Sequence, residues 1–120
     1  MKPEDRHKRV ADEMQRVIAG AIHSEVKDFD LRMVTVTRCD LARDYSEVKV
    51  HYSVLGDAEA RRKCATQLSK VAAFVQRRVA DQIKLHRSPH VRFEYDSAID
   101  ETLRLEQLFD RISRERDGTQ

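Results

Sequence analysis

The sequence predicts an α+β domain in which helices cover one face of a three-stranded sheet. Three observations lead to this prediction. Three segments repeat apolar residues at helical spacing, three shorter segments alternate apolar and polar residues, and turn-forming residues separate most of them. The expected order is helix, strand, strand, helix, kink, helix, strand, helix. We expect one domain over residues 5–112 and a polar, frayed C-terminal tail at residues 113–120.

The first helix is predicted over Asp5–Lys27, because apolar residues from Val10 to Ile22 recur at intervals of three and four. This wide apolar face is typical of a helix that packs on a flat surface. Gly20 lies inside the helix and costs about 1 kcal/mol relative to Ala. We therefore expect a close helix contact at Gly20, and a turn at Asp28–Asp30.

Two strands are predicted over Met33–Leu41 and Glu47–Leu55, where apolar and polar residues alternate. The five residues Ala42–Ser46 join them, so the pair is expected to form a hairpin. A third alternating segment, Val91–Tyr95, predicts the third strand. This alternation indicates a sheet with one covered face and one wetter face.

The last helix is predicted to follow the third strand. Ser88-Pro89 ends the preceding helical segment, and Ser97–Asp100 has the pattern of a capping box that starts a new helix. Its apolar positions are Ile99, Leu103, Leu105, Leu108, Phe109 and Ile112.

The central segment, Ala58–Arg87, contains no Gly and no Pro and collects the positive charge of the chain. Asp57 precedes it as a good N-cap. From Arg61 to Arg87 there are eight basic residues and one acid, Asp81, a net charge of +7, whereas the whole chain carries +2. Ordinary exposed helix faces mix signs and gain ion pairs. The excess therefore favours an anionic partner over the competing interpretation, a merely solvated face.

This central segment is predicted to be amphipathic. Its apolar side is formed by Cys64, Leu68, Val71, Phe74, Val75, Val79, Gln82 and Ile83. Its opposite side is a basic stripe with a small residue in the middle, formed by Arg62, Lys70, Ala73, Arg77, Lys84 and Arg87. An unbroken helix of this length spans ~45 Å, whereas a domain of this size is roughly 35 Å across. We therefore expect a kink or break around Val71–Phe74.

No pattern of catalytic or metal-binding residues is found. The sequence lacks P-loop, dinucleotide-binding and G-x-S-x-G motifs, and Pro89 separates His86 from His90. We therefore expect no enzyme activity, no cofactor, no metal and no small-molecule substrate. Cys39 and Cys64 lack CxxC spacing and are expected to be buried, reduced thiols.

The chain also shows no signal for a membrane. No apolar run approaches the ~20 residues of a membrane span, and the charged first ten residues lack the apolar core of a secretory signal. Both absences predict a cytoplasmic protein. Four aromatic residues are candidates for stacking on bases. Tyr52, Phe74 and Tyr95 fall on apolar faces and are expected in the core, whereas Tyr45 lies in the predicted turn.

Several short stretches, taken together and in order, resemble the ribosome-binding factor A family, bacterial assembly factors of the small ribosomal subunit. They are Arg9–Ala11, Glu25–Asp28, Met33–Thr37, Arg43–Ser46, Lys49-Val50, Ser53–Asp57, Phe93–Ser97, and Arg104-Leu105 followed by Leu108. They cover about residues 6–109.

The resemblance implies a type II KH-like fold and a non-catalytic monomer that binds 16S rRNA in immature 30S subunits during late maturation. It places the RNA surface on the helices around the kink. Together with the charge of this segment, it predicts phosphate contacts by Arg62, Lys70, Arg77, Lys84 and Arg87, close approach of the RNA at Ala73, and marginal contacts by Arg61, Lys63 and Arg78. The family has an Ala-x-Gly kink, which here is Val71-Ala72-Ala73. Because Ala adopts positive φ less freely than Gly, we expect a gentler bend. Phe29 stands where the family usually has Pro.

Two other functions remain open from the residues. One is a protein-interaction domain that docks an acidic partner through the same basic stripe. The other is a KH-like domain that binds free single-stranded RNA, against which the missing G-x-x-G loop argues.

Overall fold

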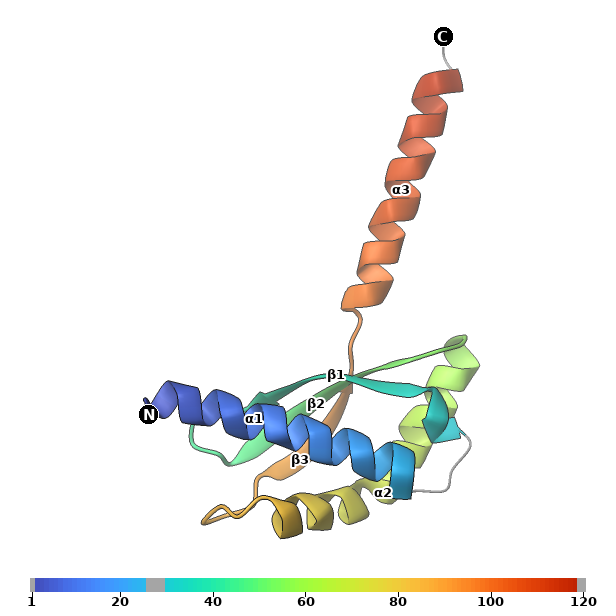
Figure 1. Cartoon of the computed structure of the whole chain (residues 1–120). Helices are drawn as coiled ribbons and strands as arrows, with labels where there is room; N and C mark the ends of the chain where they lie inside the picture. The colour runs from blue at the N-terminus through green and yellow to red at the C-terminus, as the bar shows by residue number, and fades with distance from the viewer. Residues whose placement is uncertain (1, 26–29, 119–120) are drawn as a thin grey trace.

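The computed structural model describes residues 2–25 and 30–118 of the chain (Figure 1). The elements are α1 (Pro3–Gly20), a π-helical turn (Ala21–Glu25), a 3-10 turn (Asp30–Met33), β1 (Val34–Leu41), β2 (Glu47–Val54), α2 (Ala58–Gln82), β3 (His90–Tyr95) and α3 (Ala98–Gly118). The strand order is β1-β2-β3, with β1 and β2 antiparallel and β2 and β3 parallel. The predicted α+β class and three-stranded sheet are confirmed.

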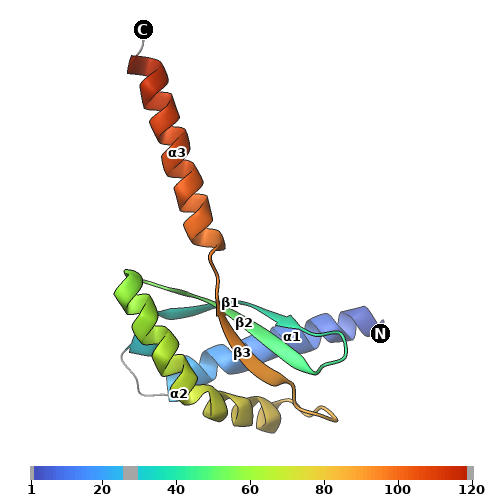
Figure 2. The same cartoon turned by 180° about the vertical axis from the view of Figure 1, so that it is seen from behind.

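Helices α1 and α2 cover one face of the sheet (Figures 1 and 2). The hydrophobic core lies between these helices and the sheet. Met14 and Ile18 of α1, Val48 and Val50 of β2, and Leu68 of α2 are all at most 1% exposed. Fully burying one such aliphatic side chain contributes about 1.5–3 kcal/mol. The helical and alternating spacings predicted these buried faces because each spacing turns its apolar residues to one side.

Helix α1 differs from its prediction at both ends. It begins at Pro3, two residues early, and Pro is well suited to the first helical turn because its missing N–H has no partner there. The α-helix ends at Gly20, and the π-helical turn follows. A side chain at Gly20 would meet no atom within 4 Å, so the expected close helix contact is wrong. Residues 26–29 lie outside the described residues, and with them Phe29 and all of the expected turn except Asp30, which begins the 3-10 turn.

The sheet has one irregularity. The register of β1 on β2 shifts between Val36 and Arg38, which is a β-bulge. The hairpin loop has the predicted length, and Tyr45 within it adopts φ 63°. It is the only non-glycine residue in the described ranges with positive φ.

Helix α2 begins as predicted, with Asp57 Oδ1 accepting a hydrogen bond from Ala60 N at 2.9 Å. The predicted end at Arg87 is wrong, because α2 stops at Gln82. Ile83 is extended, with φ −116° and ψ 108°, and is only 6% exposed. By leaving the helix, Ile83 turns into the core, so the residues that follow form a loop.

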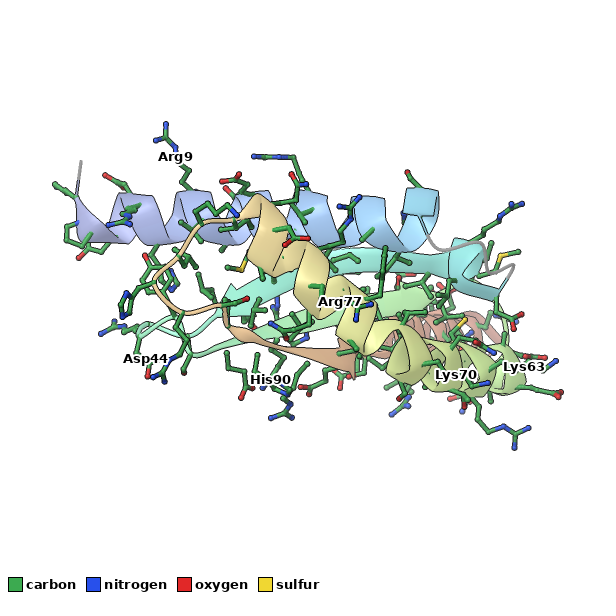
Figure 3. All side chains as sticks on the ribbon, turned by 90° about the horizontal axis from the view of Figure 1, so that it is seen from below. Arg9, Asp44, Lys63, Lys70, Arg77 and His90 are labelled. Carbon is green, nitrogen blue, oxygen red and sulfur yellow. The ribbon has the colours of Figure 1, made fainter. Side chains whose placement is uncertain are left out.

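Of the kink or break expected around Val71–Phe74, the structure shows a bend without a break. Helix α2 is continuous from Ala58 to Gln82. Its ribbon changes direction between Lys70 and Arg77 (Figure 3). After that change, the Gln76 side chain attaches the helix to β3, since its Oε1 accepts from Val91 N at 2.8 Å and its Nε2 donates to Pro89 O at 2.6 Å.

Helix α3 projects away from the other elements (Figure 1). It runs past Ile112 to Gly118, so the expected frayed tail from residue 113 is helical up to that point. Every α3 side chain that the structure describes is exposed, including the apolar Leu103, Leu105, Leu108, Phe109 and Ile112. The helical face that the spacing predicted is therefore present but does not cover the sheet.

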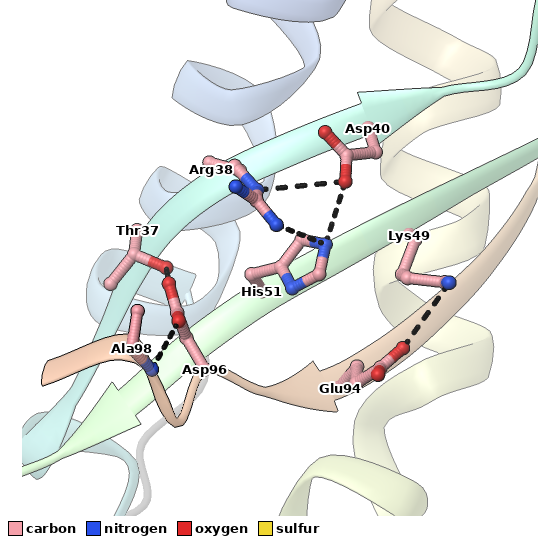
Figure 4. Close-up of polar contacts among 8 residues, drawn as sticks. All are labelled: Thr37, Arg38, Asp40, Lys49, His51, Glu94, Asp96 and Ala98. Atoms are coloured by element: carbon pink, nitrogen blue, oxygen red, sulfur yellow. Dashed lines mark hydrogen bonds and ion pairs between the residues drawn. The ribbon is translucent and has the colours of Figure 1, made fainter. Parts of the chain in front are cut away.

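Asp96 connects β3 to α3 and to β1. Its Oδ2 accepts from Thr37 Oγ1 at 2.8 Å, and its Oδ1 accepts from Ala98 N at 3.0 Å (Figure 4). These hydrogen bonds, first that from Thr37, lower the pKa of Asp96 below the ordinary 3.8. Within the expected capping box, the Asp100 side chain is outside the described residues.

We predict that Asp96→Asn flattens the acid side of the stability profile. A lowered folded pKa gives stability that is present above the unfolded pKa and is lost as pH falls through the folded value. The thermal midpoint of the wild type should therefore fall more steeply below pH 3.8 than that of the variant. Melting curves of both proteins from neutral to acidic pH test this, and parallel curves would contradict it.

A candidate nucleic-acid interface on helix α2

Helix α2 buries one side and exposes the other. Cys64, Leu68, Val75 and Val79 are at most 1% exposed, as the spacing predicted. Val71 and Phe74 are half-buried against the same core, whereas Gln82, expected on this side, is exposed at the end of the helix.

Lys70 and Arg77 lie on the exposed side, seven residues and about two turns apart (Figure 3). Ala73 is exposed between them, and Val71 and Ala72 are half-buried. Within the described ranges, no acidic side chain forms an ion pair with Lys70 or Arg77. The structure thus places Lys70, Ala73 and Arg77, the centre of the predicted basic stripe, on one exposed side of α2. The small side chain of Ala73 leaves the helix backbone accessible there.

The N-terminal cations of α2 have an internal countercharge. Arg62 Nη2 and Lys63 Nζ each lie 3.9 Å from Glu59 Oε1. Glu59 precedes the interval in which the sequence showed one acid, so the excess charge is smaller here than that count suggested. Exposed pairs of this kind contribute ~0–1 kcal/mol, which leaves both cations able to exchange Glu59 for another anion.

Arg61 has a different environment from the other cations. It is half-buried, and its guanidinium carbon lies 4.0 Å from the centroid of the Tyr95 ring. Tyr95 in turn contacts the buried Tyr52 edge to face, at 5.7 Å between ring centroids. Arg61 therefore packs against the sheet, at the margin of the basic stripe as predicted for the RNA surface, and not on the stripe itself. Arg78 is also half-buried.

Lys84 and Arg87 are exposed but are not helical, because α2 ends at Gln82. They lie in the loop that leads to β3. The predicted stripe is therefore divided into a helical part and a loop part.

The opposite face of the sheet, over the residues that the structure describes, offers no comparable excess charge. Its lysine and arginine side chains pair with neighbouring acids: Lys49 with Glu94 at 3.4 Å, Arg92 with Glu47 at 3.3 Å, and Arg38 with Asp40 at 3.5 Å. His51 Nε2 also lies 2.8 Å from Asp40 Oδ2, which completes this array. Figure 4 shows most of this array. Because these cations and acids neutralise each other, this face of the sheet attracts an anion only weakly. The exposed side of α2, by contrast, keeps unneutralised positive charge.

The cysteines are free thiols without the character of nucleophiles. Burial, and secondarily the charge of Asp40, raise the pKa of Cys39 to about 12, so this thiol stays protonated at neutral pH. Cys64 is buried and donates to Asp30 O at 3.2 Å. In the part of the chain that the structure describes, no group of three potential metal ligands lies together. None of its helices has the length and apolar character needed to cross a membrane.

The fold and its charge define a class of protein. It is a KH-like α+β domain in which helix α2 buries its apolar side against the sheet and carries cations on its exposed side. The model of one family, ribosome-binding factor A, matches residues 6–109. The chain belongs to the ribosome-binding factor A family.

A curated relative agrees with this assignment, and two structures share the fold. Ribosome-binding factor A of Syntrophomonas wolfei is 31% identical over 116 residues, which cover 95% of each chain. The crystal structure of ribosome-binding factor A from Thermus thermophilus superposes with a TM-score of 0.67 at 21% identity, covering 77% of this chain and 97% of that one. A homology model of the Thermus thermophilus factor, fitted into a cryo-EM map of a 30S complex, has a TM-score of 0.60 at 21% identity, covering 74% and 93%.

We predict that two adjacent arginines differ in their effect on stability. Arg61→Ala removes the contact with Tyr95 and should lower the free energy of unfolding by ~0.5–2 kcal/mol. Arg62→Ala, the matched control, removes only an exposed pair and should change it by less than about 0.5 kcal/mol. Urea unfolding of both variants measures the difference. Equal losses would show that Arg61 does not anchor α2 to β3.

Proposed function

We propose that this chain binds the immature 30S ribosomal subunit through 16S rRNA and assists its late maturation, including the processing of that RNA. The observation that carries the proposal is the pair Lys70 and Arg77, exposed on the face of α2 opposite the core and, among the described residues, free of acidic partners. Membership of the ribosome-binding factor A family and the likeness to a factor fitted into a 30S complex support it.

The contact surface that we propose centres on Lys70, Ala73 and Arg77. Both cations reach phosphate oxygens, while Ala73 lets the RNA backbone approach the helix. Arg62 and Lys63 extend the surface toward the start of α2, where phosphates would replace Glu59 as their partner. The remaining cations of the surface are Arg78, Lys84 and Arg87. Arg61 supports this surface from beneath through Tyr95.

Such a surface acts by position and charge. Phosphate contacts set affinity and orientation but distinguish sequences poorly, so selectivity comes from the shape of folded RNA. The bend of α2 between Lys70 and Arg77 presents the two cations on helix segments of different direction (Figure 3). In this proposal the protein is a cytoplasmic monomer that binds RNA without a cofactor and without catalysing a reaction.

The experiment is co-sedimentation with immature and mature small subunits across a salt series. We expect the wild type to bind immature subunits, with an affinity that falls steeply as salt rises. The double variant Lys70→Glu/Arg77→Glu removes two phosphate contacts. The slope of log affinity against log salt should therefore decrease by about 1.5–2.

Helix α3 provides a matched control. Arg104 and Arg111 are also exposed and also seven residues apart, so Arg104→Glu/Arg111→Glu makes the same change in net charge. This control should bind like the wild type. If both double variants lose affinity equally, total charge rather than the α2 surface determines binding. If the wild type binds neither subunit at low salt, the proposal is wrong and an acidic protein partner becomes the better explanation.

A further inference from the structure

The β1–β2 turn lies between two surface grooves that share only Arg87 with the proposed α2 surface. Arg6 and Tyr45 line both grooves, Arg43 lines one, and His86 and Arg87 line the other. These residues come from α1, from the turn, and from the loop between α2 and β3. The end of α2 at Gln82 is what brings Arg87 here, beside Tyr45 rather than along a helical stripe.

The Tyr45 backbone is held in place from within the turn. Its N–H donates to Ala42 O at 2.9 Å. The Asp44 carboxylate accepts from Ser46 Oγ at 2.6 Å and from Ser46 N at 3.1 Å, and these bonds lower the pKa of Asp44. Asp44 is thus charged and already hydrogen-bonded at neutral pH. The turn keeps Tyr45 at φ 63°, a conformation unusual for a bulky residue.

Contacts from neighbouring elements hold both the turn backbone and the Tyr45 ring. His7 of α1 bonds through Nε2 to Ala42 O at 3.1 Å and meets the Tyr45 ring edge to face, with 5.3 Å between centroids. His90 N of β3 donates to Ser46 O at 2.9 Å. The Tyr45 ring is therefore a half-buried platform with little freedom to lose on binding, flanked by cations.

We propose that this turn binds an unpaired nucleotide of RNA, whose base stacks on Tyr45 while Arg6, Arg43 and Arg87 contact the neighbouring phosphates. The inference rests on the proposed function and adds a single-stranded segment to the RNA that the protein contacts. An aromatic platform beside guanidinium groups is the usual means of holding single-stranded nucleic acid.

The same chemistry distinguishes RNA from an acidic peptide. Carboxylate side chains would satisfy the three arginines but would make no use of the half-buried Tyr45 ring. Two acids, Glu4 and Asp44, also line the grooves. Asp44 is occupied by Ser46, but both acids reduce the net field, so stacking must supply a large share of the affinity.

The test is a titration of the ¹⁵N-labelled full-length protein with a uridine hexanucleotide, followed by NMR. We expect shift changes at Tyr45 and Ser46 in the turn and at His86 and Arg87 in the loop. Tyr45→Asn should weaken binding about tenfold, since stacking on one base contributes on that order. Asn tolerates positive φ, so this variant keeps the turn. Tyr45→Phe is the matched control, which retains the ring and should bind like the wild type.

A second variant is independent of the packing of Tyr45. Arg43→Gln removes one phosphate contact from an exposed side chain and should weaken hexanucleotide binding several-fold at low salt. Absence of shift changes at the turn, or equal affinity of wild type and Tyr45→Asn, would overturn the inference. Tyr45-dependent binding of a glutamate hexapeptide as tight as that of RNA would also overturn it.

Subunit co-sedimentation separates this inference from the proposed function. If the wild type binds immature subunits but the hexanucleotide causes no shift changes at the turn, only the proposed nucleotide site is wrong. If the wild type binds no subunit at all, the proposed function is wrong, and the nucleotide site is overturned with it as a part of ribosomal RNA recognition.

Discussion

Burial of the apolar side of α2 against the sheet decides where every cation of that helix lies. With Leu68, Val75 and Val79 in the core, Lys70, Ala73 and Arg77 must face outward. Gln76 then attaches the second part of the helix to β3 through two short hydrogen bonds. The charged surface is thus a consequence of core packing.

The same packing separates cations that look equivalent in the sequence. Arg61 and Arg62 are neighbours, yet Arg61 lies over Tyr95 while Arg62 is exposed beside Glu59. On the far face of the sheet, pairs such as Lys49 with Glu94 neutralise each other. A weak total charge therefore coexists with a local excess, and the location of that excess is the reason for proposing α2 as the surface for an anionic partner.

The sequence predicted the class, the three strands and the buried side of α2, because these depend on local spacing. It could not predict the end of α2, since Ile83 continues the helical apolar spacing from Val79 and only tertiary packing turns it out of the helix. The stacking of Arg61 on Tyr95, and the groove lined by both Arg6 and Arg87, involve residues far apart in the chain. Local spacing also predicted the apolar face of α3, but it could not predict that α3 projects away from the sheet.

The proposed function depends most on the exposed face of α2 lying against 16S rRNA. A photoreactive amino acid placed at Ala73, exposed between Lys70 and Arg77, tests this directly in the complex with immature subunits, with Gln107 on α3 as the control position. We expect irradiation to join position 73, but not position 107, to 16S rRNA. Crosslinks from position 73 to ribosomal proteins alone, or equal yields of RNA from both positions, would contradict the account.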